Sequence, residues 1–352
     1  MGPDYTNNIM YSRNTGYGQA LLNMVASQVP AFGRIFIVLD PDDAGSQNYA
    51  MLNQIFTPDF DGQVRIFATN ADDGTTPLEQ AYAAAESNNN DVILLDAHST
   101  HLLSGGLAIT KSRVHFIGMD GGDRLVQQGA KVQNPADDTA AYVIKVTGTR
   151  CSFRNIKFIQ ASTNAAALTV LQEGSEGALY KNCSFVFGVA DNLDGTTAHE
   201  VLAGSDSATY LNCTFGSDTL LTSAARSVFH IDQVTTSQEF KSNILRECTF
   251  IISSSSSTAT HIRLDAITDI LFTNLFDRCN FVASIDTAGG AAIAESVQTG
   301  TGTNKGVLVF AYPATFNSTD FATATGGRTA AVQLVAPVPT AGTAGIGVTP
   351  TA

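Results

Sequence analysis

The tripeptide Cys-x-Phe occurs five times in this chain of 352 residues, each time with Ser, Thr or Asn in the middle. Successive cysteines are 32, 30, 35 and 31 residues apart, so the motif recurs with a nearly constant period. Because side chains alternate between the two faces of a strand, the Cys and Phe of each triplet share one face. The repeat predicts a ladder of inward pairs, made of Cys151, Phe153, Cys183, Phe185, Cys213, Phe215, Cys248, Phe250, Cys279 and Phe281.

A second short apolar segment precedes each triplet. These segments are residues 142–146, 167–171, 199–202, 228–232 and 261–265. The Gly-, Ser-, Asn- and Asp-containing turns between them are too short for helical crossovers. A chain that returns to the same strand about every 30 residues without a helix is a parallel solenoid, with coils about 4.8 Å apart. His230 and His261 each lie 18 residues before their coil's cysteine, which predicts equivalent positions for the two histidines.

The cysteines have an alternative interpretation, as disulfides or as a metal cluster. An odd number argues against a complete set of disulfides, and the close C-x2-C pairs that metal sites favour do not occur. A buried free cysteine behaves as a small hydrophobic residue, and stacked Cys and Phe side chains fill a narrow prism well. We therefore expect these cysteines to be structural.

A helix is predicted ahead of the repeat, in residues 75–86. Threonine precedes Pro77, and Leu78, Ala81 and Tyr82 fall on one helical face. Three short apolar strands follow, in residues 91–96, 102–109 and 114–118. The repeat of Cys-x-Phe coils begins after them.

This order of elements resembles a known family. A helix, the segment DVILLDAHSTHLLSGGLAITKSRVHFIGMDGG and coils containing NCxF are similar to right-handed parallel β-helix proteins related to pectate lyases. In that family an amphipathic helix covers the N-terminal end. The segments GRIFIVLD and MLNQIFTPDFDGQVRIFAT ahead of the helix resemble β-helix proteins encoded beside capsid genes in tailed bacteriophages. The resemblance spans roughly residues 33–310 and implies an all-β, right-handed parallel β-helix with an N-terminal capping helix and extended termini.

Three regions are predicted along the chain. Residues 1–74 form an N-terminal arm and a cap or docking module, and residues 75–315 form the β-helix. Residues 316–352 contain one good strand, at 331–335, and a tail rich in Ala, Gly, Thr and Pro. Such a tail buries too little surface to fold alone, and we expect it to be flexible or ordered against a neighbouring subunit.

Enzymes on this fold use carboxylate clusters completed by Arg or Lys. Their Asn-Thr-Asp, Asp-Asp and Gly-His-Gly runs are missing from residues 141–310. The best catalytic candidates are Asp232 and Asp265, expected in adjacent coils, with Arg263 two residues before the second. A solvated strand end explains the same residues, and we favour that interpretation.

Other polar motifs have simpler explanations than a site. His98 and His101 could ligate a metal with Asp96, but a turn accounts for them equally well. The Asp pairs at 42–43, 72–73 and 137–138 lack calcium-loop spacing, and residues 342–347 imitate a phosphate loop without its Lys or helix. Asn182 and Asn212 begin glycosylation sequons inside repeat strands, where modification is not expected. No metal and no cofactor is predicted.

Charge and composition narrow the possible partners. The formal net charge of −13 disfavours binding to nucleic acid or to an anionic membrane surface, and no apolar run is long enough to span a bilayer. The chain also lacks the tryptophans that sugar-binding surfaces favour. The resemblance to β-helix proteins encoded beside capsid genes, together with these features and the missing catalytic runs, predicts a non-enzymatic virion protein of a tailed phage. It would form a homotrimer and bind the major capsid protein or another virion protein, as a decoration, cement or head-spike protein on the outer capsid surface.

Two other classes stay open. One is a tailspike-like polysaccharide lyase or glycoside hydrolase, which would be located on the tail and would use Asp232, Arg263 and Asp265. The other is a glycan-binding adhesin on the same fold, with affinity for a polysaccharide but no turnover.

Overall fold

A computed structural model describes residues 33–39, 64–96, 100–119, 129–189, 198–223, 225–234, 239–266, 269–284, 291–301, 306–322 and 332–335. Several expectations fall outside these ranges. They concern the N-terminal arm, His98, the Asp pair at 42–43, the Gly-rich residues 342–347 and the tail beyond residue 335.

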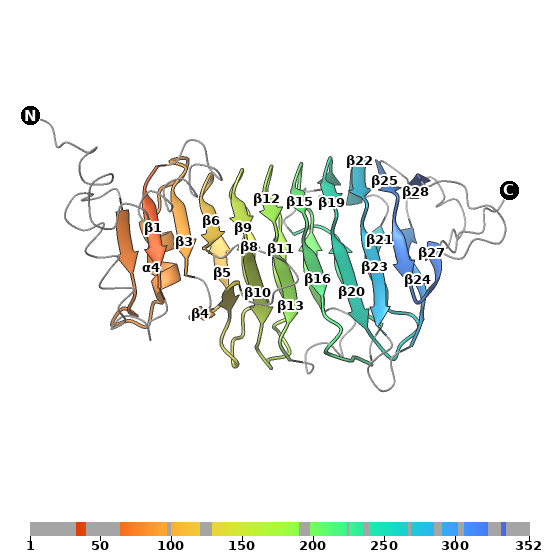
Figure 1. Ribbon diagram of the computed structural model, residues 1–352, viewed down its shortest axis with the longest axis horizontal. Coiled ribbons are helices and arrows are strands. Elements are labelled where there is room, and N and C mark those ends of the chain that lie inside the picture. Colours follow the sequence, from red (N-terminus) through yellow and green to blue (C-terminus); the bar gives the residue numbers. More distant parts are fainter. Residues whose placement is uncertain are drawn as a thin grey trace, which may run out of the picture.

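The described residues form three parallel sheets, A, B and C, and one helix (Figure 1). Sheet A contains β2 (Val64–Phe67), β1 (Ile35–Val38), β3 (Val92–Leu95), β6 (His115–Gly118), β9 (Ser152–Arg154), β12 (Leu179–Lys181), β15 (Thr209–Leu211), β19 (Ile244–Arg246), β22 (Ile270–Asp277), β25 (Gly306–Ala311), β28 (Val332–Val335) and, paired with β22, β18 (Phe240–Lys241). Sheet B contains β4 (Thr100–Leu102), β7 (Ala130–Gln133), β10 (Ile156–Gln160), β13 (Ser184–Phe187), β16 (Thr214–Gly216), β20 (Thr249–Ser253), β23 (Asn280–Ser284) and β26 (Ala314–Phe316). Sheet C contains β5 (Leu107–Ile109), β8 (Tyr142–Val146), β11 (Thr169–Glu173), β14 (His199–Ala203), β17 (Ser227–Ile231), β21 (Thr260–Ala266), β24 (Ile293–Thr301) and β27 (Ser318–Ala322).

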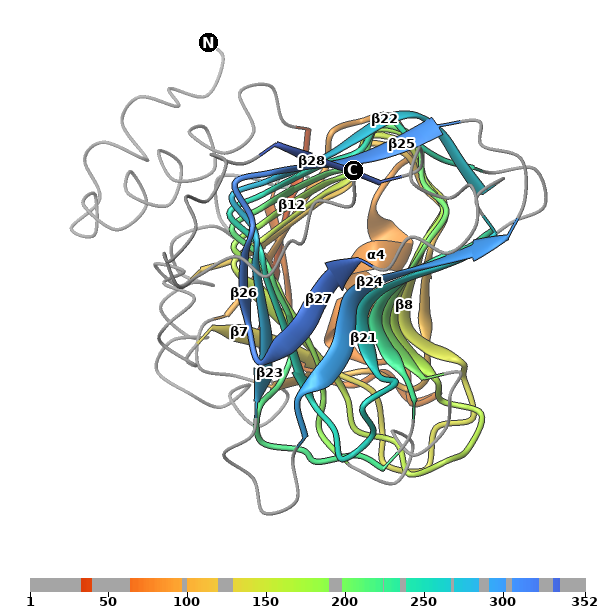
Figure 2. The same ribbon diagram turned by 90° about the vertical axis from the view of Figure 1, so that its right-hand side faces the viewer.

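The chain visits the sheets in the order A, B, C, which makes each coil a triangle. Figure 2 looks along the axis from the C-terminal end, and the chain runs counterclockwise there while it advances toward the viewer. This sense of rotation is right-handed. The fold is therefore a right-handed parallel β-helix, as the repeat and the resemblance predicted.

Two corners of each coil are built in the same way. A residue with positive φ is followed by a buried residue, in most coils Cys or Ala, and the next strand begins there or one residue later. At the corner between sheets A and B the positive-φ residues are Asn155, Asn182, Asn212, Glu247, Arg278 and Tyr312. Asparagine suits this left-handed conformation, and each amide here also bonds its neighbour: Asn182 Nδ2 donates to Asn155 Oδ1 at 3.1 Å, and Asn212 Nδ2 donates to Asn182 Oδ1 at 2.9 Å.

The predicted ladder of Cys and Phe pairs is wrong for its first triplet, because two corners of the coil resemble each other. Arg150, with φ 57°, makes the corner between sheets C and A, so Cys151 and Phe153 enter sheet A rather than sheet B. Phe153 pairs with Tyr180 in register. The other four triplets do stack on each other in sheet B, with Phe185, Phe215, Phe250 and Phe281 in one column. Both corners need a small residue before an inward aromatic residue, which is why the first triplet resembles the others.

Aromatic rings fill the interior at the spacing of the strands. In sheet B the ring centroids of Phe215 and Phe250, and of Phe250 and Phe281, are 4.9 Å apart. In sheet A those of Tyr180 and Tyr210 are 4.8 Å apart. These distances match the separation of hydrogen-bonded strands, so each coil places its ring directly over the previous one.

The helix α4 (Pro77–Ala84) covers the N-terminal end of the interior, where Figure 2 shows it behind the strands. At its start, Glu79 accepts hydrogen bonds from the backbone N–H and the hydroxyl of Thr76. At its end, Lys111 Nζ donates to the carbonyls of residues 82, 83 and 85. A cation on these free carbonyls completes the helix and ties it to the first coils.

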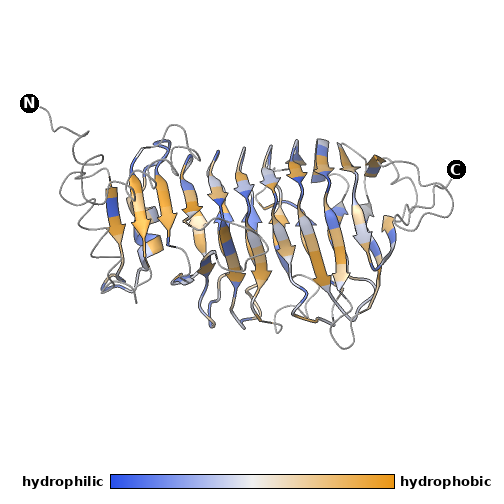
Figure 3. Ribbon diagram, viewed as in Figure 1, coloured by the Kyte–Doolittle hydropathy of each residue, from blue (hydrophilic) through white to orange (hydrophobic). Residues whose placement is uncertain are grey.

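Sheet A continues beyond both ends of the region expected for the β-helix. Strands β1 and β2 precede residue 75 and pair in parallel, and β1 also pairs with β3. Beyond residue 315, β27 joins sheet C and β28 joins sheet A. Figure 3 shows β1 and β3 as largely apolar, in keeping with the burial of every residue in both strands.

Candidate functional site

Four polar side chains meet on the outer face of sheet C, and we call His230, Asp232, Arg263 and Asp265 the outer-face cluster. Strands β17 and β21 pair with His230 opposite Arg263 and Ile231 opposite Leu264. Asp232 and Asp265 directly follow the paired residues Ile231 and Leu264, so the two carboxylates come to adjacent positions in neighbouring coils.

Short contacts organise the cluster. Arg263 Nε donates to Asp265 Oδ1 at 2.5 Å, and the backbone N–H of Gln233 donates to Asp232 Oδ1 at 2.7 Å. His230 Nε2 lies 3.0 Å from Asp265 Oδ2. Each carboxylate thus has one oxygen held by an N–H donor, which orients the group.

The histidine of the cluster is the unusual member. Its side chain is only 9% exposed, whereas that of Asp265 is 41% exposed. His230 Nε2 is thus close to a carboxylate oxygen, but neither ring nitrogen of His230 makes a hydrogen bond of good geometry. Burial lowers the pKa of His230, although the nearby carboxylates of Asp265 and Asp232 oppose this shift.

A second histidine packs beside the cluster. The ring centroids of His199 and His230 are 4.2 Å apart, and His199 Nδ1 contacts the hydroxyl and the carbonyl of Ser227 at 3.0 and 3.2 Å. Burial, together with the neighbouring His230, holds the pKa of His199 well below its usual value. Both histidines are therefore neutral imidazoles near neutral pH, the form that can ligate a metal ion.

One nitrogen of His230 and one oxygen each of Asp232 and Asp265 lie within 4.8 Å of one another. This combination has two chemical uses. An imidazole and two carboxylates form a ligand set for a divalent cation. A carboxylate pair with an Arg can also perform acid and base catalysis on a polysaccharide.

The structure brings together the three candidates named from the sequence and adds His230. The sequence argument missed His230 because it placed His230 and His261 at equivalent positions. Cys248 follows His230 by 18 residues, but Cys279 follows Arg263, the partner of His230, by only 16. The turn after β17 is longer, so His261 occupies a different column. His261 lies inside, 5.6 Å from the ring of Phe281, and burial lowers its pKa to about 4.

The other residues singled out from the sequence make contacts that are typical of turns and corners. His101 Nε2 lies 3.2 Å from the backbone carbonyl of Asp96. Asp73 and Asp138 each accept a backbone N–H two residues ahead, as turn residues do. Asn182 and Asn212, which begin the sequons, belong to the asparagine ladder at the corner between sheets A and B.

Two acidic residues lie entirely inside the β-helix. Burial raises the pKa of Glu173 to about 7, despite hydrogen bonds from Ser175 and Tyr180 that oppose the shift. Burial also raises the pKa of Glu200, and the positive charge of Arg226 opposes this rise. Arg226 reaches both oxygens of Glu200, at 3.0 and 2.8 Å. These groups stabilise or constrain the interior rather than face a substrate.

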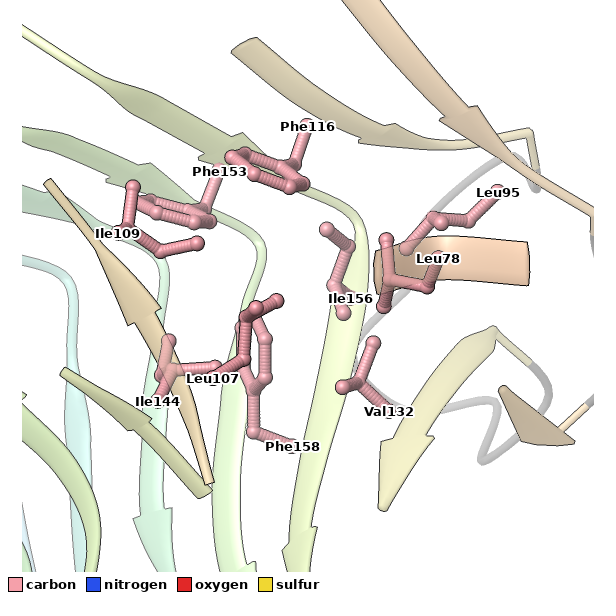
Figure 4. A pocket seen from close by; sticks show the side chains of 10 residues that line it. All are labelled: Leu78, Leu95, Leu107, Ile109, Phe116, Val132, Ile144, Phe153, Ile156 and Phe158. Carbon is pink, nitrogen blue, oxygen red and sulfur yellow. The ribbon is translucent and has the colours of Figure 1, made fainter. Parts of the chain in front are cut away.

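Figure 4 shows an apolar cavity between α4 and the first coils. Its lining consists only of hydrocarbon side chains, namely Leu78, Leu95, Leu107, Ile109, Phe116, Val132, Ile144, Phe153, Ile156 and Phe158. This cavity offers no acid, base or ligand atom. The cavity lies where α4 packs against the aromatic rings of the first coils, and it is not part of the outer-face cluster.

No protein-family model and no curated protein matches the chain. Several solved structures are similar to the chain at low identity. The deglycosylated pectin methylesterase of Aspergillus niger is 13% identical over 75% of this chain and 82% of its own, with a TM-score of 0.43. Pectin methylesterase PemA of Erwinia chrysanthemi is 11% identical over 87% and 93%, with a TM-score of 0.36. ORF18 of Geobacillus virus E2 is 8% identical over 86% and 63%, with a TM-score of 0.33.

Among the described residues, no helix has the length and apolar character needed to cross a bilayer.

Proposed function

We propose that the chain is a non-enzymatic structural protein of a tailed-phage virion. In this proposal it assembles as a homotrimer and binds the major capsid protein or another virion protein. Its place is the outer capsid surface, where it acts as a decoration, cement or head-spike protein. The sequence resemblance to β-helix proteins encoded beside capsid genes motivates this assignment, and the surface of sheet B supports assembly.

Among the described residues, the side chains on the outer face of sheet B are uncharged from β13 onward. Two outward columns run along it, and they consist of Ser184, Thr214, Thr249, Asn280 and Ala314, and of Val186, Gly216, Ile251, Val282 and Phe316. Val186 and Gly216 are buried, so the accessible part of the second column begins at Ile251. Phe316 is 55% exposed. Sheets A and C carry ion pairs on their outer faces, including the pair of Arg246 with Asp277 and that of Arg263 with Asp265.

The assembly proposal rests on this difference in charge between the outer face of sheet B and those of sheets A and C. Charged groups are expensive to desolvate in an interface, whereas β-branched, small and hydroxyl side chains pack without leaving an unpaired charge. A second copy of the same chain is the occupant that we assign to the sheet B face, because copies related by a rotation axis can pack there without burying an unpaired charge.

The test is a comparison of two matched variants by light scattering coupled to size exclusion. Ile251 lies on the outer face of sheet B and Ile244 on that of sheet A. We expect the wild type and Ile244→Asp to have three times the mass of the chain and Ile251→Asp to have the mass of one chain. A monomeric wild type, or an Ile251→Asp trimer, would contradict assembly through this face.

Location is tested separately by incubating the purified protein with phage capsids that lack it. We expect the wild-type protein to sediment with the capsids and to appear on their outer surface in electron cryomicroscopy. Protein that stays in the supernatant, or density on the tail alone, would refute the capsid assignment.

The outer-face cluster favours a second candidate function, a polysaccharide lyase or glycoside hydrolase. It gathers Asp232, Asp265 and Arg263 on one accessible face of the fold. This alternative predicts that reducing ends or unsaturated products appear when host polysaccharide is incubated with the wild type. Asp232→Asn and Asp265→Asn should each abolish them. Unchanged polysaccharide supports the structural assignment.

A further inference from the structure

We propose that His230, Asp232 and Asp265 form a binding site for one divalent transition-metal ion, of which Zn²⁺ is the representative. The site joins β17 and β21 on the outer face of sheet C. It does not depend on the role proposed above, because a decoration protein and an enzyme could both contain it.

The first argument is the state of His230. Its side chain is nine-tenths buried, it faces two carboxylates, and both ring nitrogens are without a hydrogen bond. A buried polar atom without a partner is costly, and buried imidazoles in folded proteins normally have one. A metal ion between His230 and the carboxylates would replace the poorly oriented contact of Nε2 with Asp265 by a coordinate bond.

The second argument is geometric. Zinc binds imidazole nitrogen and carboxylate oxygen at about 2.0–2.2 Å, so neighbouring ligand atoms are about 3.0–3.5 Å apart. The 3.0 Å between His230 Nε2 and Asp265 Oδ2 already meets this requirement. The third ligand atom, from Asp232, lies within 4.8 Å of both and would have to move closer by about 1 Å to coordinate the same ion.

The third argument concerns the surroundings of the ligands. Arg263 holds Oδ1 of Asp265, and the N–H of Gln233 holds Oδ1 of Asp232, which leaves the second oxygen of each carboxylate for the ion. Such outer contacts orient the ligands of many metal sites. The Arg263 charge offsets one carboxylate, so the site carries about one net negative charge. An imidazole in the set favours zinc, copper, iron or nickel over calcium, magnesium and manganese.

Isothermal titration calorimetry on the full chain tests this directly, after treatment with EDTA and dialysis. ZnCl₂ should bind the wild type with one ion per chain, while CaCl₂ should bind at least ten times more weakly. Asp232→Asn and Asp265→Asn should each weaken Zn²⁺ binding at least tenfold. Asp265 is 41% exposed, so its substitution leaves the core intact.

His115→Gln is the matched control. His115 is another largely buried imidazole, on the outer face of sheet A, but its Nδ1 contacts the hydroxyl of Ser152 at 2.8 Å and no carboxylate takes part in its contacts. The control should bind Zn²⁺ like the wild type. Circular dichroism of each metal-free variant establishes that it is folded.

A thermal melt gives a second readout, because an ion that binds only the folded chain raises its melting temperature. At the same Zn²⁺ concentration, the Tm of the wild type and of His115→Gln should rise by several degrees, and that of Asp265→Asn should rise clearly less. Absence of Zn²⁺ binding to the wild type would overturn the proposal. Equal binding by the wild type and both Asp variants would do so as well.

Discussion

Replacement of Glu173 by Gln should change how the stability of the β-helix depends on pH. Glu173 is completely buried, and its pKa is raised from 4.5 to about 7. In the unfolded chain the group loses its proton near pH 4.5, whereas the folded chain keeps it until about pH 7. The folded state therefore binds more protons between these values, and its stability falls as the pH rises through them.

The size of the effect follows from the pKa difference. One pKa unit corresponds to 1.36 kcal/mol, so the shift from 4.5 to about 7 costs the wild type about 3 kcal/mol at high pH. Gln carries no charge at any of these values and escapes this cost. At about 2 °C for each kcal/mol in a chain of this size, the Tm of Glu173→Gln relative to wild type should rise by about 6 °C between pH 4.5 and pH 7.5.

The comparison must be made between variants, because buried histidines act in the opposite direction. Burial lowers the pKa values of His115 and His261 to about 4, so both stabilise the folded chain as the pH rises from about 4 to 6.5. Their contribution is the same in wild type and variant and cancels in the difference.

The assay is a set of thermal melts followed by circular dichroism at half-unit steps of pH. Glu176→Gln is the control, since Glu176 is exposed three residues away. Its Tm difference from wild type should stay flat across the pH range. A flat difference for Glu173→Gln as well would show that the buried carboxyl keeps an ordinary pKa, and the reasoning would fail.

Three further outcomes are expected. The five free cysteines are all buried, so a thiol reagent should label none of them in the native protein and five in denaturant; rapid native labelling would contradict the packing. Asn182→Ala should destabilise by about 1–2 kcal/mol more than Asn182→Gly in urea unfolding, because φ is 54° there and Ala lacks the freedom of Gly; equal losses would argue against backbone strain. Arg226→Met should cost about 3–5 kcal/mol by leaving Glu200 charged and unpaired, and the added change Glu200→Gln should recover much of it; no recovery would mean that packing rather than charge is lost.

The fold could be predicted from the sequence because the residues that specify each corner and strand are neighbours in the chain. A residue suited to positive φ, a small buried residue, a polar residue and an aromatic residue together specify one corner and one strand, as Asn182 to Phe185 do. Repetition of this pattern at a constant period then implies stacked parallel coils. For the same reason Cys151 and Phe153 were predicted to stack with the other triplets although they belong to sheet A. The corner before sheet A has the same four-residue pattern as the corner before sheet B.

The candidate site depended on the tertiary structure. Asp232 and Asp265 could be paired in advance since both end a repeat strand, but the position of His230 beside them is set by strand register. Register across some 30 residues depends on turn lengths, and the turn after β17 is longer than its counterpart in the next coil. The sequence by itself thus determined that the chain forms stacked coils with an aromatic interior. Only the tertiary structure decided which polar groups from different coils become neighbours. A register shift costs local sequence preferences little, but a shift of one residue turns every side chain to the other face, and a shift of two gives it a different neighbour.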